Sequence, residues 1–278
     1  MDYPVDGRGP FRSMVAVGDS FTEGMCDEVL PDGEFRGWAD RVAQRLAAEA
    51  KAADGSGGFD GSDGSGEPFR YANLAVRGKL IGQIVDEQVD LAAGLGGELV
   101  TRAGGLNDVL RPGCDAEAVC ATLGAAAEKL AAGARLLVLF HSTDPSRRMA
   151  GSGRLLPAIL RLKRFVSELG ERPGIAVVEL FDAPCFDDPR LWADDRLHLS
   201  AEGHRRVAEA VLQAAGYPAS FDWRAALPPV TPPGRLHRVA ADLRWLGRHV
   251  GPWIMRRLRG TSSGDGRSPK RPELTPYP

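Results

Sequence analysis

The stretch MVAVGDSFTEG, residues 14–24, decides how the fold of this chain is interpreted. Its apolar start runs into Gly18, Asp19 and Ser20, and a polar turn follows. A short apolar run bounded by a glycine is typical of a buried strand. Ser20 is therefore expected one step beyond the end of a strand, where either an ordinary turn or a nucleophile would account for a serine.

Strand-like and helix-like stretches alternate from this point up to residue 215. The sequence predicts strands at 14–17, 69–75, 98–103, 134–140 and 174–180. It predicts helices at 35–50, 80–95, 116–132, 154–169 and 201–215. Such β-then-α order favours an α/β fold, a three-layer α/β/α sandwich around a mostly parallel five-stranded sheet. Ligands bind such sheets beyond the carboxyl ends of the strands, which is the edge where Ser20 is expected.

Composition excludes several classes of protein. The chain has 278 residues, 43% of them hydrophobic, and a formal net charge of −2, which gives no general argument for nucleic-acid binding. Its apolar runs are far shorter than the roughly 20 residues that span a bilayer. The first residues, MDYPVDGRGPFRS, lack an apolar signal-peptide core, so we expect a cytoplasmic protein.

The four cysteines are scattered along the chain, with no CxxC pair and no histidine spacing that suggests zinc. We expect them to be reduced thiols, and we expect neither a metal nor a cofactor. They are Cys26, Cys114, Cys120 and Cys185.

A serine hydroxyl needs a base, a group that orients the base, and donors for the oxyanion that forms. The segment DRLH, residues 195–198, places Asp195 three residues before His198 and lies just before the last predicted helix. This loop belongs to the same carboxyl edge as Ser20. Asp195 could fix the imidazole tautomer while the other ring nitrogen faces Ser20, although two solvated loop residues would look the same.

Two further segments follow predicted strands on that edge. NLAVRG, residues 73–78, ends in Gly78, whose backbone N–H can approach a reacting atom closely. AGGLNDVLRP, residues 103–112, contains Asn107, whose amide is suited to an oxyanion. Each segment alone would be a plain turn, but together they supply two donors beside the nucleophile and the base.

Four blocks in this order resemble the GDSL, or SGNH, hydrolase superfamily: GDSF at 18–21, Gly78, GLND at 105–108 and DRLH at 195–198. The resemblance implies a flavodoxin-like fold and esterase, lipase, thioesterase or deacetylase chemistry. It implies that Ser20 is the nucleophile, His198 the base and Asp195 the orienting residue. The oxyanion hole would be formed by the backbone N–H groups of Ser20 and Gly78 and by the Asn107 amide.

We therefore expect a serine hydrolase that cleaves a small-molecule carboxylic ester or thioester through an acyl-enzyme. Two alternatives stay open. An acyltransferase would pass the same acyl group to an alcohol, and a catalytically silent binding module would keep the fold without the reaction.

The hydrolase domain is expected over residues 1–218, with a flexible Gly/Ser/Asp loop at 54–67. A Pro- and Arg-rich extension follows at 219–278, with an amphipathic basic helix at 235–259 and a disordered tail. The helix carries one apolar stripe, which we expect to pack on the domain, with a membrane surface or another anionic partner as the alternative and nucleic acid not expected. The stripe consists of Leu236, Val239, Leu243, Leu246, Val250 and Trp253.

Overall fold

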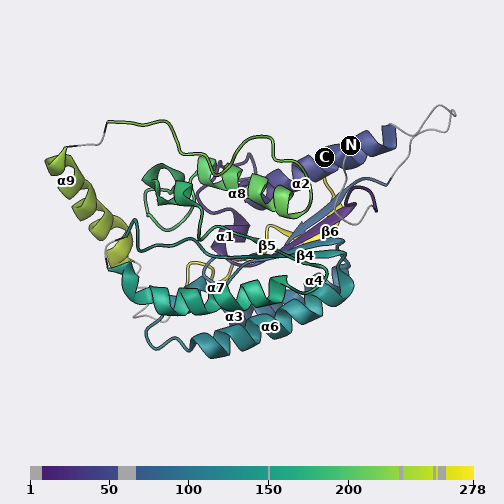
Figure 1. Ribbon diagram of the computed structural model, residues 1–278, viewed down its shortest axis with the longest axis horizontal. Coiled ribbons are helices and arrows are strands. Elements are labelled where there is room, and N and C mark those ends of the chain that lie inside the picture. Colours follow the sequence, from purple (N-terminus) through teal and green to yellow (C-terminus); the bar gives the residue numbers. More distant parts are fainter. Residues whose placement is uncertain (1–7, 56–66, 150, 232–233, 253–254, 256–260) are drawn as a thin grey trace.

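Six strands form one sheet in the order β5-β4-β3-β1-β2-β6 in the computed structural model, which describes residues 8–55, 67–149, 151–231, 234–252, 255 and 261–278 (Figure 1). Five of these strands pair in parallel. They are β1 Ser13–Val17, β2 Arg70–Asn73, β3 Leu99–Arg102, β4 Leu136–Phe140 and β5 Ile175–Val178. This confirms the predicted α/β fold with a mostly parallel sheet.

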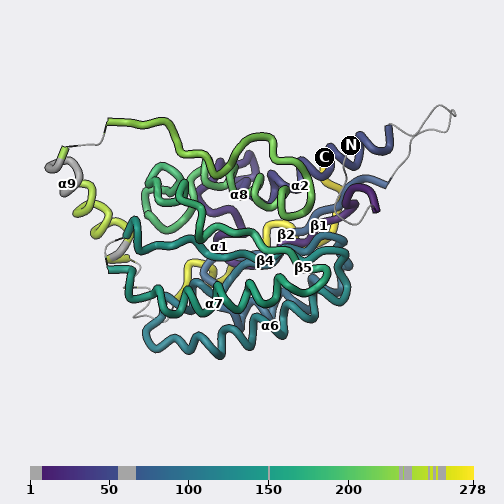
Figure 2. Tube along the Cα trace, viewed as in Figure 1, coloured from purple at the N-terminus to yellow at the C-terminus, as the bar shows by residue number. Residues whose placement is uncertain are grey.

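Helices cover both faces of the sheet, as the two views of the chain show (Figures 1 and 2). One face carries α2 Gly37–Gly55 and α8 Ala201–Ala214, which pack against each other. The other face carries α6 Ala116–Gly133, α7 Leu156–Gly170, and the run α3 Ile81–Ile84, π-helical turn Val85–Val89 and α4 Asp90–Leu95. Short helices α1 Ser20–Glu23 and α5 Leu106–Val109 follow β1 and β3 at the carboxyl edge. Three 3-10 turns lie at Ser152–Leu155, Pro184–Asp187 and Pro189–Leu191.

The two helical layers explain why residues 14–17 of β1 and all of β4 are continuous apolar runs. In β1, Met14 and Ala16 join the hydrophobic cluster on the α2 and α8 side. Val15 and Val17 join the cluster on the α6 and α7 side, because successive side chains of a strand point to opposite faces. A strand covered on both faces favours apolar residues at nearly every position.

The sheet has a sixth strand, and this corrects the expected five-stranded sheet and disordered tail. β6, Arg271–Pro276, pairs antiparallel with the outer edge of β2, with Tyr71 opposite Thr275. The Tyr277 ring packs edge-on against the Tyr71 ring, 5.2 Å between centroids. The open edge of a strand offers unpaired backbone N–H and C=O groups. Even a tail of this polar composition becomes ordered when its own backbone groups pair with them.

The predicted helix 235–259 is observed as α9 Arg235–Trp245, followed by a π-helical turn Leu246–Val250. At the two stripe positions whose side chains are described, Leu243 is 64% and Leu246 is 47% exposed, so the expected packing on the domain fails there. The side chains of Leu236, Val239, Val250 and Trp253 lie outside the described residues, as does the part of the Gly/Ser/Asp loop at 56–66.

A different face of α9 contacts the domain. Trp245 Nε1 donates a hydrogen bond to the Asp195 carbonyl at 2.8 Å. Asp242 pairs with Arg196 at 2.7 Å. Polar contacts therefore hold α9 against the domain. The alternative role of the apolar stripe, contact with a membrane surface or another anionic partner, stays a prediction.

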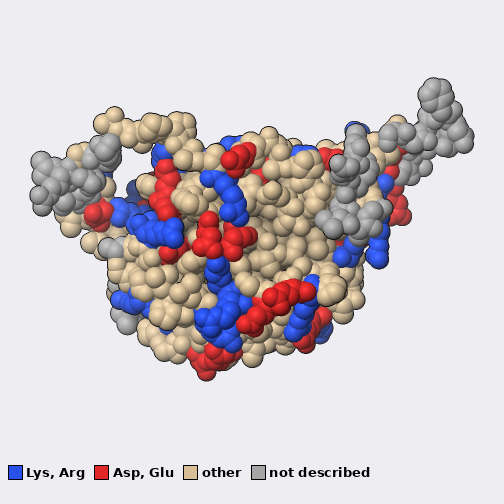
Figure 3. Space-filling model, viewed as in Figure 1, with Lys and Arg blue, Asp and Glu red and all other residues tan. Residues whose placement is uncertain are grey.

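None of the helices in the described residues combines the length and the apolar character that crossing a membrane requires. On the face drawn in Figure 3, acidic and basic side chains are interspersed over the surface. That mixture agrees with the formal net charge of −2.

Candidate active site

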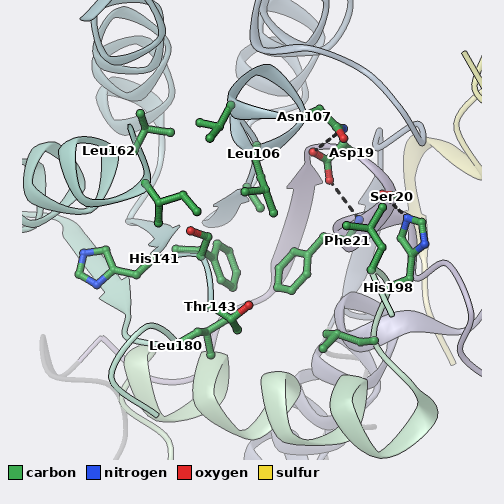
Figure 4. Close-up of a pocket in the computed structure, with 18 of the residues that line it drawn as sticks. Asp19, Ser20, Phe21, Leu106, Asn107, His141, Thr143, Leu162, Leu180 and His198 are labelled. Carbon is green, nitrogen blue, oxygen red and sulfur yellow. Dashed lines mark hydrogen bonds between the residues drawn. The ribbon is translucent and has the colours of Figure 1, made fainter. Parts of the chain in front are cut away.

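Ser20 is the first residue of α1, just beyond the end of β1. Asp19 caps this helix by accepting a hydrogen bond from the Phe21 N–H at 3.1 Å. Ser20 is 9% exposed, and its Oγ lies 3.0 Å from Nε2 of His198 (Figure 4). The strand and the helix cap thus place the hydroxyl at the carboxyl edge, next to an imidazole.

His198 and Asp195 lie on the loop that precedes α8. Nδ1 of His198 is 2.6 Å from Oδ2 of Asp195. Oδ1 of Asp195 accepts the backbone N–H groups of Leu197 and His198 at 2.9 and 3.0 Å. In the neutral form of the ring we assign the hydrogen to Nδ1 from these contacts, which leaves a lone pair on Nε2 for the Ser20 hydroxyl. The structure therefore brings Ser20, His198 and Asp195 into one hydrogen-bonded chain.

Asp195 and His198 shift each other's pKa. Burial opposes ionisation of Asp195, but the hydrogen bond and charge of His198 outweigh it and lower the pKa of Asp195 to about 2. Burial likewise opposes protonation of His198, but Asp195, together with Cys26, outweighs it and raises the pKa of His198 to about 9. The site therefore stabilises an imidazolium, which is what a base becomes after it accepts a proton.

The three groups predicted to bind an oxyanion come from three different segments: Ser20 begins α1, Gly78 lies in the turn after β2, and Asn107 lies in α5. Neither the Ser20 N–H nor the Gly78 N–H donates a hydrogen bond to any described residue. Nδ2 of Asn107 donates to Oδ2 of Asp19 at 3.1 Å and to the Lys79 carbonyl at 3.0 Å. The two backbone N–H groups are thus unengaged. The Asn107 amide could donate to an oxyanion only by giving up its hydrogen bond to Asp19 or to the Lys79 carbonyl.

A buried ion pair that sequence reasoning missed ties the Gly78 loop to α1. Glu23, the last residue of α1, accepts the Arg77 backbone N–H at 2.6 Å and its Nε–H at 2.8 Å. The two side chains are 6% and 10% exposed, respectively. Gly78 follows with φ 75°, in the left-handed region that favours glycine. The helix that carries Ser20 therefore also fixes the position of Gly78.

The C-terminal tail, residues 261–278, borders this side of the site. Lys270 donates a hydrogen bond to the Glu23 carbonyl at 2.8 Å and pairs with Asp40 at 2.5 Å. The Lys270 and Asp40 side chains are almost completely buried. Ser262 lies against Gly78, with its Oγ 3.4 Å from the Gly78 carbonyl. No motif in the sequence points to these contacts.

Replacing Lys270 with methionine should destabilise the protein. Asp40 would lose its buried partner, and burial already raises the pKa of this carboxyl to about 6. Breaking a buried pair costs about 3–5 kcal/mol, or roughly 10 °C in Tm for a chain of this size. Thermal unfolding followed by circular dichroism measures the shift. Lys129→Met, which removes a lysine from an exposed pair with Asp90, is the matched control, and equal shifts in both variants would contradict the assignment.

A cavity of about 130 Å³ extends from Ser20 into the layer between the sheet and α7. Figure 4 shows Leu106, Leu162 and Leu180 around it, with Ser20 on one side of the view and His141 on the other. Most of its lining is apolar. An apolar cavity that opens beside a nucleophile can hold a hydrocarbon group while polar groups at the mouth hold the reacting atoms.

A second Ser–His–carboxylate arrangement lies at another wall of the cavity. Nδ1 of His141 is 2.5 Å from Oε2 of Glu179, and its Nε2 is 3.0 Å from Oγ of Ser167. Ser167 lies inside α7, and its hydroxyl donates to the Lys163 carbonyl at 3.1 Å. Backbone N–H groups in the interior of a helix are used by the helix itself, so none is free beside Ser167 for an oxyanion. The unengaged backbone N–H of Ser20 itself distinguishes the two serines.

Among the described residues, one group of side chains could hold a metal ion: Cys26, Asp195 and His198, with ligand atoms within 4.8 Å of one another. Oδ2 of Asp195 and Nδ1 of His198 are 2.6 Å apart. Two ligands of one tetrahedral zinc ion, each about 2.0 Å from it, would be roughly 3.3 Å apart. The observed spacing fits a hydrogen bond better than shared coordination.

The GDSL-like lipase/acylhydrolase family model matches residues 16–206. The matched segment contains all four sequence blocks and ends within α8, so the whole C-terminal extension lies beyond it. The comparison with curated proteins finds no match.

Several solved structures share the fold. An acetyl xylan esterase from Geobacillus stearothermophilus matches with a TM-score of 0.60 and 18% identity, covering 77% of this chain and 99% of its own. An alpha/beta hydrolase enzyme from the metagenome of Lake Arreo, Spain, matches with a TM-score of 0.57 and 21% identity, covering 75% and 96%. A lipase/acylhydrolase from Enterococcus faecalis matches with a TM-score of 0.53 and 19% identity, covering 73% and 94%. At these identities the matches establish a common fold.

Proposed function

The chain belongs to the GDSL-like lipase/acylhydrolase family, and we propose that it cleaves a small-molecule carboxylic ester or thioester through an acyl-enzyme on Ser20. The observation that carries this proposal is the chain of hydrogen bonds from Ser20 through His198 to Asp195, at 3.0 and 2.6 Å, at the mouth of an apolar cavity. Nucleophile, base and orienting carboxylate are the groups that a serine hydroxyl needs for attack on a carbonyl carbon.

In the first half of the reaction, Nε2 of His198 takes the proton of Ser20 as Oγ attacks the carbonyl carbon. The tetrahedral intermediate collapses when His198 returns that proton to the leaving alcohol or thiol, which leaves the acyl group on Ser20. In the second half, His198 takes a proton from water, the hydroxide attacks the acyl carbon, and the carboxylic acid departs as Ser20 recovers its proton. Asp195 stays ionised and stabilises the imidazolium in both halves.

The negative charge that develops on the carbonyl oxygen needs donors already in place. We assign this role to the unengaged N–H groups of Ser20 and Gly78. The Asn107 amide joins them by releasing either Asp19 or the Lys79 carbonyl.

Hydrolysis of p-nitrophenyl esters, from acetate to dodecanoate, tests the proposed function. An apolar cavity of 150 Å³ holds benzene, so a cavity of about 130 Å³ should accept an acyl group of about six carbons at most. We expect kcat/KM to be highest for the short esters and to fall for the long ones. If no ester is hydrolysed faster than by the Ser20→Ala variant, the proposed function is wrong.

The rate should rise with pH into the alkaline range. His198 accepts a proton only when neutral, and Asp195 raises the pKa of His198 to about 9 in the free enzyme. Below that value, kcat/KM should rise about tenfold per pH unit and then level off. In Asp195→Asn the inflection should move to lower pH, because the charge that favours the imidazolium is gone. An inflection at the same pH in both proteins would rule out His198 as the titrating base.

A further inference from the structure

Arg102 is a buried cation that the proposed reaction does not use. It is the last residue of β3 and is 2% exposed. Its Nε and Nη2 atoms are buried and have no hydrogen-bond partner among the described residues. Guanidinium groups buried in proteins are normally paired, so donors without a partner point to a group that the protein alone does not supply.

Arg102 also lines the cavity beside Ser20. Side chains alternate along β3, so Arg102 lies on the same face as Val100, which belongs to the hydrophobic cluster under α6 and α7. Leu123 of α6 and Val166 of α7 line the cavity from that side. The guanidinium is therefore on the cavity side of the sheet, among apolar side chains.

The nearest carboxylates do not engage this cation directly. Asp19 accepts hydrogen bonds from Phe21 and Asn107, and Asp108 accepts one from the Ile81 N–H. No ion pair within 4.0 Å joins Arg102 to either aspartate among the described contacts. Burial raises the pKa of both aspartates, which weakens their charge as counter-ions. Burial lowers the pKa of Arg102 to about 10, so the guanidinium still carries its charge at neutral pH.

We propose that Arg102 binds a carboxylate at the far end of the acyl group, so that the preferred substrate is a monoester or monothioester of a short dicarboxylic acid. This inference rests on the proposed function, because it assigns the acyl group that is transferred to Ser20. The apolar walls would contact the methylene groups, and Arg102 would donate its free N–H groups to the distal carboxylate. The cavity of about 130 Å³ limits such an acyl group to about four to six carbons.

The experiment compares esters that differ only in the distal group. Monoethyl glutarate and ethyl pentanoate have acyl chains of the same length, and titration of the released acid follows both. A charge-assisted hydrogen bond in a buried site should favour the glutarate by roughly tenfold to hundredfold in kcat/KM. In Arg102→Met this ratio should fall to one or below. Arg111 is an exposed arginine whose charge, like that of Arg102, lowers the pKa of Asp108. The control variant Arg111→Met should keep the wild-type ratio.

Binding to Ser20→Ala separates this inference from the proposed function. Calorimetry should detect monoethyl glutarate binding to Ser20→Ala and weaker binding to Ser20→Ala/Arg102→Met, whether or not the wild-type enzyme turns over an ester. If neither ester is hydrolysed but binding depends on Arg102, the proposed reaction is wrong and the carboxylate site stands. A wild-type preference for ethyl pentanoate, or an unchanged ratio in Arg102→Met, would overturn the inference. The comparison of the two esters with wild-type enzyme needs no variant. It therefore tests the inference even if Arg102→Met fails to fold.

Discussion

Replacing Ser20 with alanine should lower kcat for ester hydrolysis by on the order of 10⁶-fold, as the loss of a nucleophile does in a serine protease. The hydroxyl forms the covalent bond to the acyl group, and its Oγ is the atom that lies 3.0 Å from Nε2 of His198. The substitution removes one oxygen atom from a residue that is 9% exposed, so the fold should be unaffected. Single-turnover and steady-state hydrolysis of a short p-nitrophenyl ester, with thermal unfolding as a check, measures the effect.

Ser167→Ala is the matched control for this prediction. It removes the same atom from the same kind of Ser–His–carboxylate arrangement, formed with His141 and Glu179. Because Ser167 has no free backbone N–H beside it, this variant should retain the wild-type rate. A large loss in Ser167→Ala and a small loss in Ser20→Ala would exchange the roles of the two serines.

Replacing His198 with alanine should cost nearly as much as replacing Ser20, because the nucleophile and its base act as one unit. Without Nε2 of His198, no group takes the proton from the Ser20 hydroxyl as it attacks. The double variant Ser20→Ala/His198→Ala should then be hardly slower than either single variant. If the two losses instead multiply, the two residues act independently and the proposed proton transfer is wrong.

His141→Ala tests whether the loss in His198→Ala is specific. His141 is also a buried imidazole with a serine and a carboxylate as partners, and it lines the same cavity. Its replacement changes the wall of the cavity but not the proton transfer, so we expect a much smaller fall, mainly in KM.

The parallel sheet and the position of the candidate site could be predicted from the sequence, because both follow from local patterns. Strands buried on both faces tend to be continuous apolar runs, as in residues 136–140, and these runs alternate with amphipathic stretches. In a parallel sheet all carboxyl ends meet at one edge. Segments more than 170 residues apart, around Ser20 and His198, could therefore be placed together without any contact information.

The sixth strand could not be predicted, because it depends on a partner and not on its own residues. β6 contains Pro272 and Pro276, and proline is normally a sign against a strand. An edge strand tolerates it, since one side of the strand needs no donor. The burial of Lys270 depends in the same way on Asp40, which lies 230 residues away in the chain.

Arg102 could have been recognised as unusual from the sequence, because it places a charge inside a predicted buried strand. It lies in the predicted strand 98–103, at a position where the observed strand is buried on both faces. A charge in such a strand needs an explanation, but only the structure shows that its donors have no partner and that it borders the cavity.

The most direct test of the central claim, that Ser20 is the nucleophile of a serine hydrolase, is covalent labelling. Wild-type protein is treated with a fluorophosphonate probe, digested, and searched by mass spectrometry for the modified residue. The account predicts a single adduct on Ser20, formed at the wild-type rate in Ser167→Ala and abolished in both Ser20→Ala and His198→Ala. An adduct on Ser167, or equal labelling of wild type and Ser20→Ala, would contradict it.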